Sequence, residues 1–93
     1  MKNYELLYII DATVADEKRE ALIEKVSAMV TSNGGEAQEP ERWGVKKFAY
    51  PINYKNEGYY VLMNFKAEAN VPEIMKSQLL ITDGVVRHMI VAK

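Results

Sequence analysis

Residues 42–52 bring together, in one short stretch, side chains of the kinds that bind nucleic acid. The stretch reads RWGVKKFAYPI and holds three aromatic rings, three cations and no acid. Aromatic rings stack on unpaired bases, and Lys or Arg attracts phosphate, a combination that RNA-binding surfaces use. Gly44 allows a turn or bulge, and Pro51 should end the strand that residues 45–50 favour. The stretch predicts a strand with exposed RNA-binding chemistry, unless Phe48 and a neighbouring ring simply belong to the core.

The overall composition is that of one ordinary globular domain covering residues 1–93. Of the 93 residues, 48% are hydrophobic and 27% are charged, and no apolar run approaches the about 20 residues that span a bilayer. The start of the chain also lacks an apolar signal region, so we expect a cytoplasmic protein with no membrane partner. The net charge is −1, so RNA binding would depend on a local cationic patch.

No pattern of catalytic or metal-binding residues is visible. The chain has no cysteine and a single histidine, His88, with no nucleophile or ligand set around it. Glu39 and Glu41 flank Pro40 and are typical of a solvated rim rather than an acid–base pair. We therefore expect no catalytic residue, no metal, no cofactor and no small-molecule substrate.

Changes in hydrophobic period predict the elements that position these residues. Residues 4–10, 59–67 and 85–91 favour strands, residues 36–41 an edge strand that continues into 42–52, and residues 53–58 a hairpin loop. From about Val14, apolar residues at helical spacing predict an amphipathic helix of about five turns. Thr13 and Asp16 resemble its capping box, and Gly34 its left-handed end. A second helix should start around Asn70 and Pro72. Four of its residues should form the face turned toward the core: Ile74, Met75, Gln78 and Leu79.

The order strand, helix, strand, strand, helix, strand predicts an α+β, ferredoxin-like split βαβ fold. Its four-stranded antiparallel sheet has both helices on one face, so the other face meets water or a partner. In the first strand the even-numbered residues should face the helices, which leaves Leu7 and Ile9 on the open side. Strand parity adds four further apolar side chains to that side: Tyr60, Leu62, Met89 and Val91. Such a platform is typical of a protein-binding surface.

Four sequence features together resemble the bacterial small-subunit ribosomal protein six family. They are Tyr4-Glu5, Trp43-Gly44 followed by KKFAYPI, the strand GYYVLM at 58–63, and the ending VRHMIV at 86–91. The resemblance covers essentially the whole chain. It implies a structural component of the small ribosomal subunit that binds the central domain of the ribosomal RNA as a heterodimer with small-subunit ribosomal protein eighteen. The family often begins with two basic residues, whereas here Asn3 follows Lys2.

The residues and the resemblance together give two sets of candidate site residues. The candidates for RNA binding are Lys2, Asn3, Lys46, Lys47, Asn53, Lys55 and Arg87. The candidates for the protein partner are Leu7, Ile9, Trp43, Tyr50, Tyr60, Leu62, Met89 and Val91. Arg87 is the strongest RNA candidate, because a guanidinium binds phosphate with two donors and can also stack on a base.

Two other classes of protein share the same order of elements. A small-molecule sensor would use the apolar platform to form a homodimer. A hydrolase of the acylphosphatase type would need an anion-binding loop after the first strand, but Asp11, Ala12 and Thr13 provide neither glycine nor cation there.

Overall fold

The structure is a computed structural model in which strands and helices follow the predicted order. It describes the backbone of residues 1–52 and 55–93 and the side chains of residues 1–47 and 57–93. The elements are β1 (Lys2–Asp11), α1 (Asp16–Ser32), β2 (Glu36–Ala37), β3 (Glu41–Ile52), β4 (Lys55–Ala67), α2 (Val71–Leu80) and β5 (Val85–Ala92). Within the described residues, neither helix is long and apolar enough to cross a membrane.

The strands form one antiparallel sheet in the ferredoxin-like arrangement. β1 lies in the centre between β4 and β5, and both β2 and β3 pair with the other edge of β4. The predicted continuous edge strand over 36–41 is wrong, because pairing stops after Ala37 and resumes at Glu41. Pro40 lies in this gap and has no backbone N–H for the ladder. The edge is thus divided into the two-residue strand β2 and the twelve-residue strand β3, and the sheet is otherwise the predicted four-stranded one.

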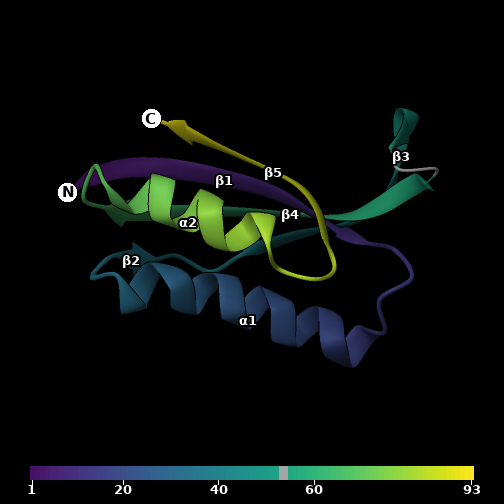
Figure 1. Ribbon diagram of the computed structural model, residues 1–93, viewed down its shortest axis with the longest axis horizontal. Coiled ribbons are helices and arrows are strands. Elements are labelled where there is room, and N and C mark those ends of the chain that lie inside the picture. Colours follow the sequence, from purple (N-terminus) through teal and green to yellow (C-terminus); the bar gives the residue numbers. More distant parts are fainter. Residues whose placement is uncertain (53–54) are drawn as a thin grey trace.

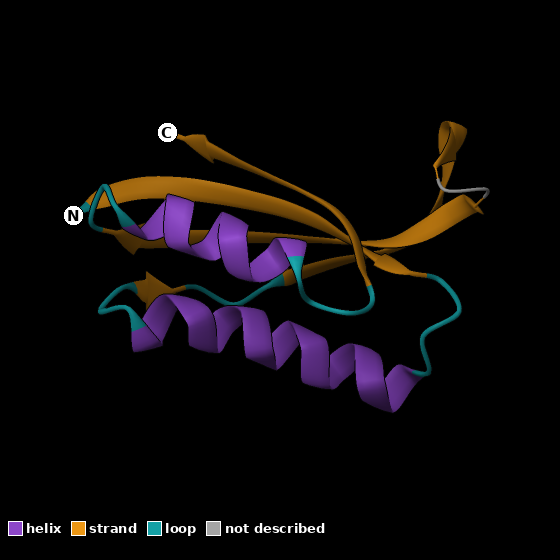
Figure 2. Cartoon of the chain, viewed as in Figure 1, coloured by secondary structure: helices purple, strands orange, loops and turns teal. Residues whose placement is uncertain are grey.

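Both helices cover the same face of the sheet, as Figures 1 and 2 show. The core lies between these two layers. From β1 it takes the side chains of Tyr4, Leu6, Tyr8 and Ile10, all of which are buried. The predicted parity of β1 is therefore confirmed. From α1 the core takes Ile23, Val26, Met29 and Val30, as the helical spacing indicates.

The start of α1 differs from the predicted capping box. The helix begins after Ala15, which has an extended backbone and makes no side-chain cap. Thr13 instead donates its backbone N–H and its hydroxyl to Oδ1 of Asp11, at 3.0 and 2.8 Å. The prediction is wrong because the helix starts two residues later than the capping box requires: Ala15 is the N-cap, and Thr13 belongs to the turn before it. At the other end Gly34 has a φ of +82°, which confirms the left-handed stop.

α2 starts where predicted but turns a different face inward. Its N-cap is Asn70 and Pro72 lies in its first turn. The buried residues are Val71, Pro72, Met75 and Leu79, so Ile74 and Gln78, which are exposed, were wrongly assigned to the inner face. Residues 71, 75 and 79 follow one another at four-residue intervals and so form a single line on the helix. That line meets the sheet, and positions 74 and 78 lie beside it.

The hairpin between β3 and β4 is longer than predicted. Residues 55–58 belong to β4 rather than to a loop, since Lys55 pairs with Ile52. Residues 53 and 54 connect the strands and lie outside the described part of the chain. Pro51 does not end β3; the pairing is irregular between Lys47 and Ile52, and an irregular edge strand tolerates proline. In Figure 1 the hairpin extends beyond the end of the helical layer.

Candidate functional site

The face of the sheet opposite the helices carries apolar residues from three strands in register. Leu7 of β1 lies between Leu62 of β4 and Met89 of β5. One step along the strands, Ile9 lies between Tyr60 and Arg87. Side chains directly opposite one another on antiparallel strands are close neighbours. These six residues therefore form one continuous surface, called the open face below.

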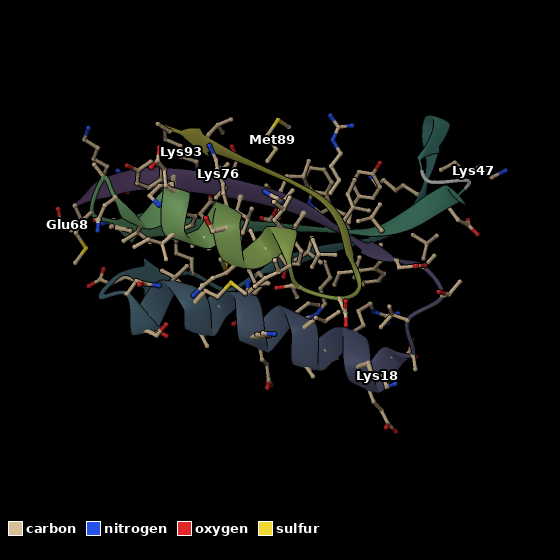
Figure 3. The ribbon with its side chains drawn as sticks, in the orientation of Figure 1. Lys18, Lys47, Glu68, Lys76, Met89 and Lys93 are labelled. Carbon is tan, nitrogen blue, oxygen red and sulfur yellow. The ribbon has the colours of Figure 1, made fainter. Side chains whose placement is uncertain are left out.

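No described helix or loop covers the open face. Figure 3 shows Met89 projecting from the side of the sheet that lies away from both helices. Its side chain is 53% exposed, whereas Ile9 beside it is only 6% exposed. A depression of about 200 Å³ lies here, lined by Leu7, Ile9, Tyr60, Arg87, His88 and Met89. An apolar floor with exposed apolar edges is suited to receive the side chains of a partner.

A bulge in β3 places Trp43 next to this face. Arg42 pairs with Val61 and Gly44 pairs with Tyr60, so Trp43 is the extra residue in the strand. Gly44 has a φ of +86°, which favours glycine, as the sequence indicated. The indole Nε1 of Trp43 donates to Oε2 of Glu41 at 3.4 Å. The ammonium of Lys46 lies 4.8 Å from the centre of the indole ring, a cation–π contact.

The structure separates the two neighbouring lysines of β3. Lys46 pairs with Gly58 and Lys47 with Glu57, so their side chains leave opposite faces of the strand. Because Lys46 contacts Trp43, it is the member of the pair that lies with the open face. Lys47 lies on the helix side of the hairpin. Both are exposed.

The other predicted RNA-binding residues are spread over both faces. Arg87 is exposed and opposite Ile9, at the open face. Asn3 is opposite Lys66 on the same face. Lys2 is even-numbered like Tyr4 and Leu6, so its side chain leaves β1 on the helix side. The predicted Asn53 lies outside the described residues, and the side chains of Lys55 and Tyr50 do as well. Of the partner candidates, Val91 is also exposed on the open face, opposite Glu5.

Arg42, the third cation of the stretch 42–52, is held on the helix side. Its Nε and Nη2 donate to the two carboxylate oxygens of Glu20, at 3.2 and 2.9 Å. This hydrogen-bonded pair raises the pKa of Arg42. Burial of the nearby Tyr8 hydroxyl, in turn, raises the pKa of Tyr8. Arg42 therefore supports the packing of α1 on the sheet and adds no free charge to the open face.

One end of the open face is polar, and the sequence analysis did not identify most of its residues. A cavity of about 210 Å³ is lined by Asn3, Tyr4, Gln38, Asn64, Phe65 and Lys93. The backbone N–H of Lys93 donates to the carbonyl oxygen of Asn3 at 2.9 Å. Lys66 and Lys93 thus extend the cationic edge beside Asn3. Strand alternation was the signal that assigns Asn64 and Lys66 to this face, since both are even-numbered like Leu62.

His88 lies on the helix side, opposite Tyr8. Burial and, to a smaller extent, the charge of Lys76 lower its pKa. Because the folded protein then binds this proton less readily than the unfolded chain, His88 should reduce stability as the pH falls below about 6.5. We expect His88→Gln to flatten the stability profile between about pH 5 and 7, measured by urea unfolding. An unchanged slope in this window would contradict this assignment.

The fold and this face define a ferredoxin-like domain in which no described helix or loop covers one side of the sheet. The family model for ribosomal protein S6 matches residues 3–92 of the chain. The small ribosomal subunit protein bS6 of Clostridioides difficile is 45% identical over 91 residues, covering 98% of each chain. The corresponding protein of Clostridium novyi is 44% identical, over 98% of this chain and 96% of its own. The crystal structure of 30S ribosomal protein S6 from Thermotoga maritima superposes with a TM-score of 0.93 at 29% identity, covering 99% of this chain and 87% of that one.

The chain belongs to the ribosomal protein S6 family and is a structural component of the small ribosomal subunit. Its place in the cell is therefore the ribosome, in the cytoplasm. The family resemblance seen in the sequence is confirmed.

Proposed function

We propose that the chain, as a single domain, binds the central domain of small-subunit ribosomal RNA as a heterodimer with small-subunit ribosomal protein eighteen, and that it has no catalytic activity. The observation that carries this proposal is the open face. Its apolar centre, Leu7, Ile9 and Met89, is in register with an exposed cation, Arg87. The partner takes the apolar centre, and cations at the edge reach the RNA backbone.

The charge of the chain explains why the partner is needed. At a net charge of −1, no overall positive field attracts RNA. Lys66, Lys93 and Arg87 are exposed near the open face, and each offers a single phosphate contact. A basic partner bound beside them adds positive charge to the same surface. Once one protein of the heterodimer has bound the RNA, the other is held close to it and binds at a high effective concentration. RNA affinity should therefore rise steeply when the partner is present.

The direct test measures RNA binding with and without the partner. A fragment of the central domain is titrated with the chain alone, with protein eighteen alone and with the equimolar mixture, at fixed salt. We expect the mixture to bind at least about tenfold more tightly than either protein. Equal binding by the chain alone would contradict the proposal. Sedimentation of the chain alone distinguishes the homodimeric sensor, which requires a stable dimer without protein eighteen.

Arg87 allows the RNA contacts to be tested separately from the protein contacts. In Arg87→Ala the RNA affinity of the heterodimer should fall about fivefold to tenfold, because one charge-assisted contact is lost. The slope of log K against log salt should decrease by about 0.7–0.9, the value of one phosphate contact. Heterodimer formation, measured by calorimetry without RNA, should persist. Loss of heterodimer formation would instead assign Arg87 to the protein interface.

Lys47→Ala is the matched control for Arg87→Ala. It removes an exposed cation that leaves β3 on the helix side, away from the open face. We expect a smaller change in RNA affinity than for Arg87→Ala. An equal or larger change would show that the RNA reaches round the hairpin.

A further inference from the structure

A groove lies on the helical side of the molecule, between α1 and the connection from α2 to β5. It is formed by two cavities of about 350 and 380 Å³ that share Lys25 in their walls. From Lys18 to Ser32 it follows α1 for about 21 Å, at 1.5 Å per residue. The opposite wall is formed by Gln78, Ile81, Thr82, Asp83 and Gly84. The sheet separates this groove from the open face.

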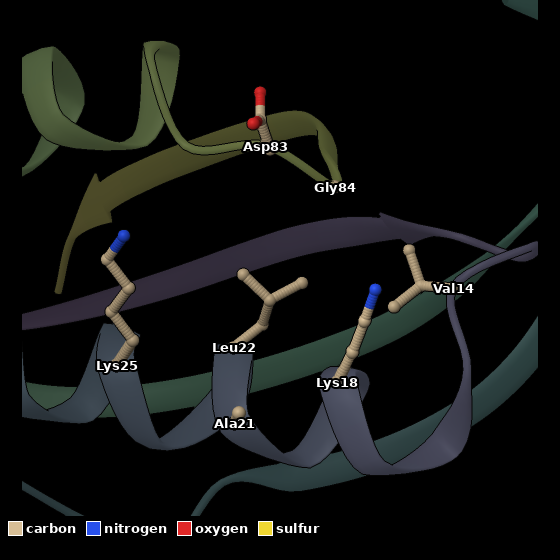
Figure 4. Close-up of a pocket in the computed structure, with 7 residues that line it drawn as sticks. All are labelled: Val14, Lys18, Ala21, Leu22, Lys25, Asp83 and Gly84. Atoms are coloured by element: carbon tan, nitrogen blue, oxygen red, sulfur yellow. The ribbon is translucent and has the colours of Figure 1, made fainter.

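The groove combines an apolar lining with two free cations. Figure 4 shows Lys18 and Lys25 extending from α1 on either side of Leu22, toward the connection that carries Asp83 and Gly84. Within the described part of the chain, neither lysine takes part in an ion pair. The Asp83 carboxylate points away from α1 in the same view. The groove therefore carries two cations and one acid, Asp83, and neither cation is held in an ion pair with a described residue.

The sequence of α1 sets both lysines in an apolar stripe. On a solvated helix, lysines are stabilised by acids three or four residues away. Around Lys18 and Lys25 these positions are all apolar: Val14, Ala15, Ala21, Leu22, Ala28 and Met29. None of the acids Glu17, Glu20 and Glu24 is three or four residues from either lysine; by the period of 3.6 residues they lie at the flank of this stripe or behind it. The groove side of α1 thus lacks the negative charges that would normally balance its lysines.

The opposite wall contributes one large apolar side chain, Ile81, and is held close to α1. Ile81 is 82% exposed, although it is a large hydrophobic residue beside the groove. Gly84 has a φ of +94°, which favours glycine, and a Cβ atom there would lie 2.8 Å from Cδ1 of Leu22, so glycine allows the connection to pass close to the helix. The groove is therefore formed without rearrangement, which lowers the cost of binding.

We propose that this groove binds an acidic amphipathic helix of a second protein. Its length along α1 matches about four helical turns, which is more than a compact small molecule would fill. A helix in such a groove buries one apolar stripe, and acids beside that stripe would meet Lys18 and Lys25, which are two turns apart. This interaction goes beyond the proposed function, because it uses the helical side of the molecule, opposite to the open face.

The test uses a synthetic peptide as the probe. An amphipathic helical peptide of about five turns, with a leucine stripe flanked by glutamates, is titrated into the full chain labelled with ¹⁵N. We expect amide shifts at residues 18–32 and 78–84 and not on the open face. A peptide with the same leucine stripe and lysines in place of glutamates should bind at least about tenfold more weakly.

Matched substitutions separate the groove from its surroundings. Lys25→Glu should weaken peptide binding about tenfold, and Lys76→Glu, on α2 outside both cavities, should leave it within about twofold. Ile81→Ser should weaken it about fivefold, because apolar contact is lost. Leu80→Ser is the control, since Leu80 is similarly exposed at 79% but does not line the groove. Both exposed positions allow substitution without loss of the fold.

Three results would overturn the proposal. The first is a set of peptide-induced shifts confined to the open face. The second is peptide binding that Lys25→Glu and Ile81→Ser leave unchanged. The third is equal binding of a uridine oligonucleotide at the groove, which would make it a site for polyanions and not for an acidic helix.

Discussion

Met89→Glu should weaken binding of small-subunit ribosomal protein eighteen by about 100-fold, or about 2.7 kcal/mol. Met89 lies opposite Leu7 on the open face and is 53% exposed in the free protein. A partner that covers this surface would bury the new carboxylate among apolar side chains, and an unpaired buried charge costs several kcal/mol. The measurement is calorimetric titration of the variant with protein eighteen.

The free protein should tolerate the same change, because position 89 stays in contact with water. We expect its free energy of unfolding to change by less than about 1 kcal/mol. Leu80→Glu is the control: it adds the same charge at an exposed apolar residue on the helical side and should leave the affinity for protein eighteen unchanged. Normal binding by Met89→Glu would show that the partner does not cover the centre of the open face, and would remove the main support for the proposed function.

Gly35→Ala should destabilise the fold by about 2–3 kcal/mol, the upper part of the range of about 1–3 kcal/mol for overpacking a well-packed site. A Cβ atom at Gly35 would lie 2.7 Å from Cγ1 of Val30 and 2.8 Å from the carbonyl oxygen of Lys66. These atoms belong to the end of α1 and to β4, so the methyl group would force the helix and the sheet apart. Urea unfolding of the variant measures the loss.

The neighbouring Gly34 is the matched control, because backbone conformation favours glycine there, whereas close packing favours glycine at position 35. Gly34 has a φ of +82° but its Cβ would meet no atom within 4 Å. Gly34→Ala should therefore cost only about 1 kcal/mol, the penalty of a left-handed backbone. If Gly34→Ala proves the more damaging of the two, backbone conformation and not close packing would govern the end of α1.

The sequence by itself determined the order of the elements and the side of β1 that faces the helices. Both depend on short-range periods, which are two residues in strands and 3.6 in helices. Leu7 and Ile9 could be assigned to the open face in this way. The glycines indicated the end of α1 at Gly34 and a turn or bulge around Gly44. The family was recognisable from motifs that extend along the chain, from Tyr4-Glu5 to residues 86–91.

The tertiary structure decided which partners the cations of residues 42–52 have and where the turn before α1 ends. The sequence placed three cations in the stretch 42–52 but did not show that one of them, Arg42, pairs with Glu20, 22 residues earlier. The bulge at Trp43 and the register with β4 decided that Lys46 lies with the indole and Lys47 does not. The failed capping box at Thr13 and the misassigned Ile74 and Gln78 have similar causes. Each outcome depends on contacts between groups distant in sequence or, at Thr13, on the exact residue at which a helix begins after a turn, and residue spacing does not encode either.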